Sequence, residues 1–426
     1  MKLTLNPTSF HGDIQVPSSK SLSHRAVICA ALADGESILS QVLESVDLTA
    51  TCAGMRILGA QIEEVSPGTL RVHGLTKDQL PQGGTIDCAE SGSTLRFLIP
   101  LVLSGAPITL TGHGRLAERP QGPYREILDK QQIAYQLLDP TGLELPLHLQ
   151  GTLQPDHFVL PGNISSQFIS GLLFALPRLA GDSRISLTGP IESVGYIDLT
   201  LSSLKQFGVE IEVSEDHREY QIRGNQSYQS ANTQVEGDYS QAAFWLVAGA
   251  LGQGITLSGL RADSLQGDRA ILDILERMGA KWAWQRNQLV VYPSQTHGTV
   301  IDGSQCPDII PVLAVLGAAS QGVTKIINAG RLRIKESDRL TAMATELRKI
   351  GVSIEEGPDS LTIEGRSYFS GGTIDSWNDH RIAMAMGVAA VRATAPLHLE
   401  GAESVQKSYP TFWKDYQQLG GKVDEC

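Results

Sequence analysis

The sequence predicts an α/β protein of two domains, each with three repeats of a βαβαββ unit around buried helices. Three observations support this fold. The chain has 426 residues, which is too long for one hydrophobic core. A short helix-ending pattern recurs at a nearly constant spacing. Strongly apolar segments lie in the same frame as that pattern.

The recurring pattern reads L-x-x-apolar-Gly-small-x-apolar, with some variation at its first position. Its clear copies are MRILGAQI, LKQFGVEI, LERMGAKW, LRKIGVSI and YQQLGGKV, which contain Gly59, Gly208, Gly279, Gly351 and Gly420. Each glycine is expected to end an amphipathic helix, because glycine adopts the left-handed conformation that closes a helix at no steric cost. In a degenerate copy, LDKQQIAY, Gln132 replaces the glycine, so we expect that helix to end differently.

Six apolar segments alternate with these helix ends. Beyond its first turn each is apolar on nearly all sides, which predicts a buried helix with a polar start. The segments are residues 19–33, 90–103, 165–180, 238–251, 307–320 and 378–391. Alternating residues after each helix end predict hairpins. The repeated unit is therefore a strand, a buried helix, a strand, a second helix and a hairpin.

The units divide into two groups of three, and this division sets the domain boundaries. The polar segment 226–238 follows the third unit and is the expected linker. The strand at 2–5 precedes the first unit, and we expect it to pair with the last one. We therefore predict one domain at 15–234 and a discontinuous second domain at 1–14 and 235–426.

The composition argues against several classes of protein. The net charge of −12 disfavours nucleic acid as a partner, and the apolar runs are too short for a membrane helix. The cysteines form no CxxC pair and match no zinc pattern; they are Cys29, Cys52, Cys88, Cys306 and Cys426. With no signal-like segment before the strand at 2–5, these features predict a cytoplasmic protein with reduced thiols.

Cationic side chains gather at the starts of the buried helices and in the loops before the second helices. The first group is Lys20, Arg25, Arg96 and Arg381, and the second is Arg119, Lys335, Arg339 and Lys407. Helix N-termini offer unpaired N–H groups and a partial positive charge, which favour phosphate and carboxylate. If equivalent ends of the two domains face each other, they form a cationic active-site cleft between the domains for a small polyanion.

Two carboxylates lie among these cations. Asp308 begins the fifth buried helix, and Glu336 follows Lys335. Either acid alone is compatible with a helix cap or a salt bridge. Together in a cationic cleft they are typical of proton-transfer groups. A metal site is not indicated, because Asp379 and His380 are adjacent and have no second ligand cluster at a suitable spacing.

Motifs at these positions resemble one known family over essentially the whole chain. The segments are PSSKSLSHR (17–25), SGSTLRF (91–97), ERPQG (118–122), SSQF (165–168), YIDLTL (196–201), PD (307–308), RIKESDRL (333–340), NDHR (378–381) and QKSYP (406–410). In order and spacing they resemble the 5-enolpyruvylshikimate-3-phosphate synthases. The family's fold, two domains of three βαβαββ units with the site between them, agrees with the fold that the periodicity predicts.

The resemblance implies a reaction. The enolpyruvyl group of phosphoenolpyruvate would move to the 5-hydroxyl of shikimate 3-phosphate, with release of phosphate, by addition–elimination through a tetrahedral intermediate. This is a step of the shikimate pathway to chorismate and the aromatic amino acids. The resemblance implies no metal or organic cofactor. We expect a monomer whose partners are these two small molecules, with no nucleic acid and no membrane.

The resemblance also assigns roles, residue by residue, to the matching motif positions. The catalytic groups would be Asp308, Glu336 and Lys20, with Glu336 exchanging the C3 proton and Asp308 accepting the hydroxyl proton. Shikimate 3-phosphate would bind to Lys20, Ser21, Arg25, Ser165, Ser166, Gln167, Ser193, Asp308 and Lys335. Phosphoenolpyruvate would bind to Lys20, Gly92, Arg119, Gln167, Arg339, Arg381 and Lys407, with Arg96 nearby.

Some positions depart from the family pattern. Glu90 stands where an amide is usual, and it is expected to pair with an arginine. Ser18 replaces a glycine of the first loop and is expected to tolerate that glycine's turn. Gly92 keeps the position where a side chain would crowd phosphoenolpyruvate and the inhibitor glyphosate, so glyphosate sensitivity is expected.

The sequence argues against three alternative functions. A UDP-N-acetylglucosamine enolpyruvyl transferase usually carries a reactive cysteine in the loop equivalent to 111–122, and this loop has none. A catalytically silent anion-binding protein would not need the retained acids Asp308 and Glu336. An RNA-end-processing enzyme of similar repeat architecture is disfavoured by the acidic charge.

Overall fold

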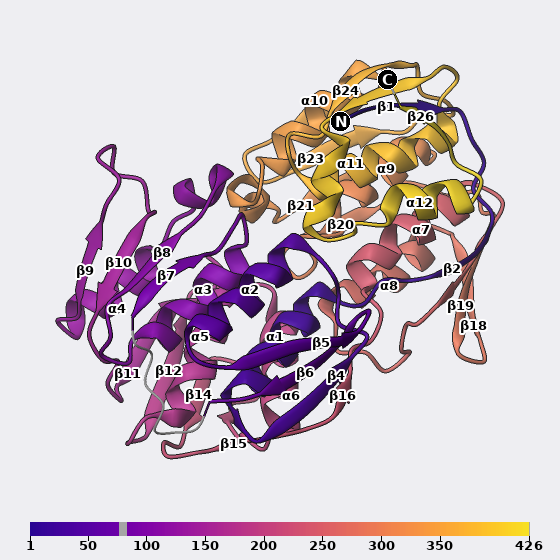
Figure 1. The fold of residues 1–426 in the computed structure, drawn as a ribbon. Helices are drawn as coiled ribbons and strands as arrows, with labels where there is room; N and C mark the ends of the chain where they lie inside the picture. The colour runs from indigo at the N-terminus through magenta and orange to yellow at the C-terminus, as the bar shows by residue number, and fades with distance from the viewer. Residues whose placement is uncertain (76–82, 426) are drawn as a thin grey trace. The chain divides into compact units, whose positions relative to one another are not determined.

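The computed structural model describes residues 1–75 and 83–425. The chain forms two compact α/β units, which we call unit 1 (residues 1–18 and 236–426) and unit 2 (residues 19–235). Figure 1 labels many of their helices and strands. Within the described ranges, no helix combines the length and apolar character needed to cross a membrane.

Unit 2 contains three copies of the βαβαββ unit. The first comprises β16 (Thr233–Gln234), α1 (Lys20–Leu32), β4 (Glu36–Ser40), α2 (Val46–Ile57), β5 (Gln61–Ser66) and β6 (Thr69–His73). The second comprises β7 (Gly84–Asp87), α3 (Gly92–Val102), β8 (Ile108–Thr111), α4 (Gly122–Lys130), β9 (Ala134–Leu137) and β10 (Leu147–Gln150). The third comprises β11 (His157–Pro161), α5 (Ser166–Ala175), β12 (Ser183–Thr188), α6 (Val194–Gln206), β13 (Glu212–Val213) and β14 (Glu219–Ile222).

Unit 1 contains three more copies. The first comprises β2 (Gly12–Gln15), α7 (Tyr239–Leu251), β17 (Ile255–Ser258), α8 (Ile271–Arg277), β18 (Lys281–Gln285) and β19 (Gln288–Tyr292). The second comprises β20 (Val300–Asp302), α9 (Ile310–Ala319), β21 (Val323–Ile327), α10 (Arg339–Lys349), β22 (Ser353–Glu356) and β23 (Leu361–Glu364). The third comprises β24 (Gly372–Asp375), α11 (His380–Ala389), β25 (Leu397–Glu400), α12 (Phe412–Gln418), β26 (Lys422–Glu425) and β1 (Lys2–Asn6).

Short 3-10 helices accompany these elements. η1 (Gly114–Glu118), η3 (Gly267–Ala270), η4 (Gly330–Ile334) and η6 (Ala402–Lys407) lie before second helices of the repeats. η2 (Leu176–Arg178) and η5 (Ala390–Arg392) continue α5 and α11. Two of the predicted cations, Arg119 and Lys335, directly follow a 3-10 helix, and Lys407 is the last residue of another.

The sheets of all the copies share one strand order, of which β7-β8-β10-β9 is an example. In this sheet β7 and β8, which flank the buried helix α3, pair in parallel, and the hairpin strands β9 and β10 add antiparallel pairings. A right-handed crossover helix is the usual connection between parallel neighbours. The repeat predicted from the glycine spacing is therefore also a repeat of sheet topology.

Strands from outside the local sequence complete three of the sheets. β1 pairs with β25 and β26, as expected for the strand at 2–5. β2 pairs with β17, whereas β16 supplies the parallel partner of β4. The segment 226–238 is therefore not a free linker: β15 (Tyr228–Gln229) pairs with β3 (Ala33–Asp34), and β16 lies in the first sheet.

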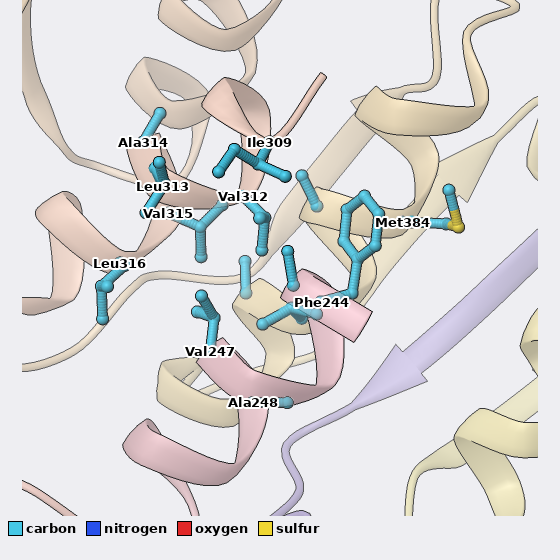
Figure 2. Close-up of a cluster of buried hydrophobic side chains, with 14 of the residues drawn as sticks. Phe244, Val247, Ala248, Ile309, Val312, Leu313, Ala314, Val315, Leu316 and Met384 are labelled. Atoms are coloured by element: carbon cyan, nitrogen blue, oxygen red, sulfur yellow. The ribbon is translucent and has the colours of Figure 1, made fainter. Parts of the chain in front are cut away.

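The buried helices form the centre of each unit. In unit 1 α7, α9 and α11 pack together, and Phe244, Val312 and Met384 of these helices meet in the cluster of Figure 2. In unit 2 α1, α3 and α5 lie in the second hydrophobic core. Burial of such side chains stabilises each unit by roughly 1.5–3 kcal/mol per large aliphatic residue. Because the helix sides are enclosed, the polar starts are the parts left for binding.

Four cysteines lie in these cores. Cys29, Cys52, Cys88 and Cys306 are buried free thiols, whereas Cys426 lies outside the described residues.

Ser18 does not adopt the left-handed turn expected of it. It forms an antiparallel bridge with Gly237, where extended backbone suits serine.

The expected difference at Gln132 is also wrong. The second helices end at glycines with positive φ, for example 112° at Gly59 and 78° at Gly208. Gln132 adopts the same conformation, with φ 55°. The hydrogen bond from the Ile133 N–H to the Leu128 carbonyl, 2.9 Å, matches the one that closes α2. Tertiary packing imposes the repeat geometry, and the glutamine carries the strain.

Replacing Gln132 with glycine should therefore stabilise unit 2. Relief of left-handed strain is worth about 1–2 kcal/mol, and the added flexibility of glycine costs about 0.5–1 kcal/mol. We expect Gln132→Gly to raise the free energy of unfolding by about 0.5–1 kcal/mol in urea titrations. Gln132→Ala keeps the strained backbone and is the control, for which no gain is expected. A destabilised Gln132→Gly protein would contradict this account.

Candidate functional site

The buried helices of unit 2 begin at serine caps. Ser19, Ser91 and Ser165 precede α1, α3 and α5, and each hydroxyl accepts a hydrogen bond from a backbone N–H of the first turn. A neutral cap satisfies one N–H without cancelling the partial positive charge of the helix end. These ends therefore keep their attraction for anions.

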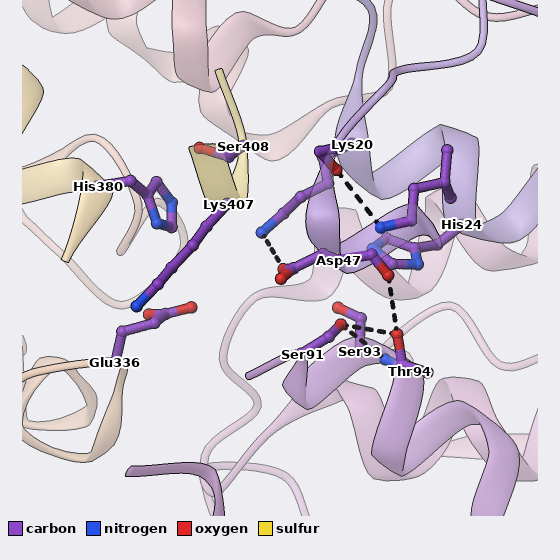
Figure 3. Close-up of polar contacts among 12 residues, drawn as sticks. Lys20, His24, Asp47, Ser91, Ser93, Thr94, Glu336, His380, Lys407 and Ser408 are labelled. Atoms are coloured by element: carbon purple, nitrogen blue, oxygen red, sulfur yellow. Dashed lines mark hydrogen bonds and ion pairs between the residues drawn. The ribbon is translucent and has the colours of Figure 1, made fainter. Parts of the chain in front are cut away.

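Lys20, the first residue of α1, forms an ion pair that the sequence analysis did not predict. Its Nζ lies 2.9 Å from Oδ2 of Asp47, in the first turn of α2 (Figure 3). Both side chains are largely buried, with exposed fractions of 14% and 8%. The carboxylate fixes the ammonium group at the start of α1.

Arg25 lies one turn further along α1 and is almost fully buried. Its guanidinium donates to the Thr200 hydroxyl at 2.9 Å and to the carbonyls of Ser21 and Tyr196 at 2.7 Å each. Burial lowers the pKa of Arg25 to about 10. The described residues offer it no carboxylate, so this buried positive charge favours an anion.

Arg96 connects the starts of α3 and α5. Its Nη1 donates to Oε1 of Gln167 at 3.0 Å and to the Ser165 hydroxyl at 3.4 Å. The Gln167 amide donates in turn to the Ser93 hydroxyl at 3.0 Å. The cation lies 4.6 Å from the ring centroid of Phe168. The predicted Arg96, Ser165 and Gln167 are thus one hydrogen-bonded group.

Arg119 lies against Gly92 at the start of α3. A Cβ added at Gly92 would lie 2.6 Å from Nη1 of Arg119, so the glycine makes room for the guanidinium. Arg119 is only 7% exposed, and its Nε has no hydrogen-bond partner within the part of the chain that the structure describes. A buried N–H donor without a protein partner is available to an anion.

Three serines of the predicted set occupy helix starts in unit 2. Ser21 is in the first turn of α1, and Ser166 is the first residue of α5. Ser193 precedes α6 with φ 57° and is almost fully buried. A non-glycine residue in this conformation costs about 1–3 kcal/mol, and such strain clusters at binding sites.

Glu90, the atypical acid, lies close to the backbone of η1. A Cβ added at Gly114 would lie 2.6 Å from Oε2 of Glu90. Gly114 has φ 54°, so the glycine is required both by its backbone conformation and by this close approach.

In unit 1 the helix starts carry aspartates. Asp238 caps α7 and Asp379 caps α11 through hydrogen bonds with first-turn N–H groups. Asp308 lies two residues before α9 and does not cap it, because Ile309 occupies that position. Asp308 instead contacts cations of neighbouring elements, so the helix-cap interpretation of this residue is wrong.

Arg339, the first residue of α10, holds three carboxylates. Its guanidinium lies 2.9 Å from Asp308, 2.8 Å from Glu336 and 2.8 Å from Asp379. Burial alone lowers the pKa of Arg339, but Asp379, Glu336 and Asp308 outweigh burial and raise it. The arginine is therefore permanently charged, and it brings together the two acids predicted for proton transfer.

Lys335 and Arg381 add two cations to this group. The Lys335 ammonium lies 3.3 Å from Oδ1 of Asp308, and burial lowers the pKa of Lys335 to about 8. Nη2 of Arg381 lies 3.7 Å from Oδ2 of Asp308. Its Nε and Nη1 are buried and have no hydrogen-bond partner among the described residues. Arg381 thus has unused donors, as Arg119 does in unit 2.

Lys407 ends η6 and is 9% exposed. Its Nζ donates to the carbonyl of Asn378 at 2.6 Å. In Figure 3 its side chain extends toward Glu336. A carbonyl orients the ammonium group and leaves its positive charge uncompensated by that contact.

Sequence reasoning missed Asp47 and the role of Asp379. The signal available in the sequence was an acid, Asp47, in the first turn of α2. Nothing local indicated that this acid pairs with Lys20. Asp379 was considered only as a metal ligand. Within residues 1–75 and 83–425, no group of three His, Cys, Asp or Glu side chains is arranged to hold a metal ion.

Comparisons with known proteins agree with this arrangement. Residues 5–416 match the family model of EPSP synthase (3-phosphoshikimate 1-carboxyvinyltransferase). The chain is 49% identical over 428 residues to a 3-phosphoshikimate 1-carboxyvinyltransferase of Clostridium novyi, covering 98% of this chain and 97% of the relative. It is 50% identical over 427 residues to that of Clostridium acetobutylicum, covering 99% and 98%.

A solved structure gives the same result. The EPSP synthase from Acinetobacter baumannii aligns with a TM-score of 0.82 at 26% identity and covers 100% of both chains. These similarities favour this family over the alternatives weighed from the sequence. The chain belongs to the EPSP synthase (3-phosphoshikimate 1-carboxyvinyltransferase) family of transferases.

Proposed function

We propose that this enzyme transfers the enolpyruvyl group of phosphoenolpyruvate to the 5-hydroxyl of shikimate 3-phosphate and releases phosphate. The observation that carries the proposal is the set of buried arginines with unused N–H donors. Arg119 in unit 2 and Arg381 in unit 1 each have at least one such group within the described residues. Both substrates carry phosphate and carboxylate, which are the groups that arginine binds with two parallel hydrogen bonds.

Unit 2 supplies most of the groups for shikimate 3-phosphate in this proposal. Neutral serine caps leave its helix starts attractive to a phosphate. The proposed ligands are Lys20, Ser21, Arg25, Ser165, Ser166, Gln167 and Ser193, with Asp308 and Lys335 contributed by unit 1. The domains predicted at 15–234 and at 1–14 with 235–426 remain part of this proposal.

Phosphoenolpyruvate is bound in this proposal by cations of both units. Lys20, Gly92, Arg119 and Gln167 belong to unit 2, and Arg339, Arg381 and Lys407 belong to unit 1. Gly92 is required because any side chain there would displace the Arg119 guanidinium. The same crowding would affect glyphosate, so the glycine supports the expected sensitivity to this inhibitor.

The proposed chemistry begins with protonation of C3 of phosphoenolpyruvate, because the enol carbon C2 is not electrophilic before that. Glu336, in its protonated form, donates this proton and later recovers one from C3. Asp308 accepts the hydroxyl proton of shikimate 3-phosphate with assistance from Lys20, and this proton leaves with the phosphate. The three carboxylates around Arg339 are balanced by Arg339, Lys335 and Arg381. A proton can move within this group without leaving an unpaired buried charge.

The cations stabilise the charge that develops as phosphate leaves the tetrahedral intermediate. Lys407 and Arg381 are held by a carbonyl and by Asp308, so they are oriented before substrate arrives. No step of this reaction needs a metal or an organic cofactor. We further propose that the protein is cytoplasmic and monomeric. Light scattering on the purified protein tests the monomeric state.

Phosphate release is the direct test of the function. The purified enzyme should release phosphate only when shikimate 3-phosphate and phosphoenolpyruvate are both present. Replacing shikimate 3-phosphate with UDP-N-acetylglucosamine should abolish release. Release from phosphoenolpyruvate alone, or no release with both substrates, would overturn the proposal.

Removing either proposed proton-transfer group should reduce turnover and spare binding. Glu336→Gln and Asp308→Asn should each lower kcat by about 10²–10⁴-fold, the usual contribution of a positioned acid or base. Binding of shikimate 3-phosphate should change little, because the cations of unit 2 remain. Steady-state kinetics and titration calorimetry measure the two quantities. Near-normal turnover in one variant would remove that residue from the mechanism.

The lowered pKa of Lys335 predicts a pH dependence of binding. Below about pH 8 the Lys335 ammonium is charged in the free enzyme, and above it the group loses its proton. KM for shikimate 3-phosphate should therefore be flat at pH 6.5–7.5 and rise up to about tenfold per unit above pH 8. Lys335→Arg keeps the charge and should remove this rise. A rise that persists in Lys335→Arg would assign it to another group.

A further inference from the structure

A fully buried carboxylate, Glu346, lies on α10 outside the proposed substrate-binding set. It comes seven residues after Arg339, and this spacing places both side chains on the same face of the helix. Isolated burial of a carboxylate is unfavourable, so its partners show what it does.

Glu346 accepts hydrogen bonds from three donors. Its oxygens lie 2.9 and 2.8 Å from the ammonium group of Lys349. Oε2 accepts the backbone N–H of Asp375 at 3.0 Å, and Oε1 accepts the indole N–H of Trp377 at 2.8 Å. Lys349 is 42% exposed, so its contact is weakened by solvent. The two bonds to the loop between β24 and α11 are the specific ones.

That loop is strained. Trp377 and Asn378 have φ values of 55° and 50°, although neither is glycine. Two such residues cost about 1–3 kcal/mol each and persist only when their surroundings hold them. The Asp375 carboxylate accepts the N–H of Trp377, and the Ser376 hydroxyl accepts that of Asn378 at 3.2 Å. Glu346 therefore holds the Asp375 N–H at the start of this turn and the indole of Trp377.

The turn and the residue after it contact two cations of the proposed site. The Asn378 carbonyl receives the Lys407 ammonium at 2.6 Å. Asp379, the next residue, receives Nε of Arg339 at 2.8 Å and the Ser337 hydroxyl at 2.9 Å. α10 thus holds the two ends of one short segment, through Glu346 at its start and Arg339 at its end.

We propose that Glu346 is a positioning residue for phosphoenolpyruvate: by holding the strained turn 375–378, it sets the position of the Lys407 ammonium. This inference rests on the proposed function, in which Lys407 binds phosphoenolpyruvate. Loss of the turn would move the Asn378 carbonyl and with it the cation. Shikimate 3-phosphate depends mainly on unit 2 and should be unaffected.

The test compares Glu346→Gln and Trp377→Phe with the matched control Lys349→Met. Glutamine places an NH2 group where Asp375 needs an acceptor, and phenylalanine removes the indole donor. Each should raise KM for phosphoenolpyruvate about tenfold, the effect of losing one buried hydrogen bond, with KM for shikimate 3-phosphate changed by less than about twofold. Lys349→Met removes the third partner of Glu346 and should leave both KM values unchanged.

A double-mutant cycle separates positioning from general destabilisation. In a Lys407→Met background, which removes the ammonium group that donates to the Asn378 carbonyl, Trp377→Phe should cause little further increase in KM for phosphoenolpyruvate. Additive effects, or equal increases for both substrates, would overturn the assignment of Glu346. The wild-type enzyme is assayed alongside: its failure to release phosphate would overturn the proposed function itself. Trp377→Phe keeps the inference testable if Glu346→Gln does not fold.

Discussion

Everything in this protein depends on the burial of helices that are apolar on nearly all sides. Such a helix offers only its two ends to solvent and ligand. In both units three of these helices lie in one hydrophobic core, and small four-stranded sheets surround that core. The chemistry is therefore confined to the helix starts and to the loops before the second helices. The repeat explains why charged groups from distant segments of the chain lie at equivalent positions of each unit.

The two units treat their helix starts differently. Serine caps in unit 2 leave the helix charge uncompensated, and Arg25 and Arg119 add buried cations without carboxylate partners among the described residues. Aspartates in unit 1 neutralise the helix ends and pair with cations such as Arg339. An attractive field for anions and a balanced set of carboxylates and cations are thus built from one repeated scaffold, by changing the residue at equivalent positions.

Left-handed backbone conformations occur both beside the proposed binding residues and at a helix end. Ser193, Trp377 and Asn378 adopt left-handed conformations beside residues assigned to substrate, and buried partners such as Glu346 hold the last two in place. Gln132 has the same conformation on an exposed surface. The strain at Gln132 follows from the helix end that the repeat imposes. The distinction between the two cases lies in the partners of each turn, not in the dihedral angle.

The sequence by itself determined the repeated unit and the buried helices, because periodicity and glycine positions are local properties of the chain. The family resemblance supplied the substrates and the roles. Tertiary structure alone decided that β16 completes the first sheet, that Asp47 holds Lys20, and that Arg339 joins Asp308 to Asp379. These pairings connect distant segments, and a pattern of neighbours carries no information on which distant partner will satisfy a buried charge or an open strand edge.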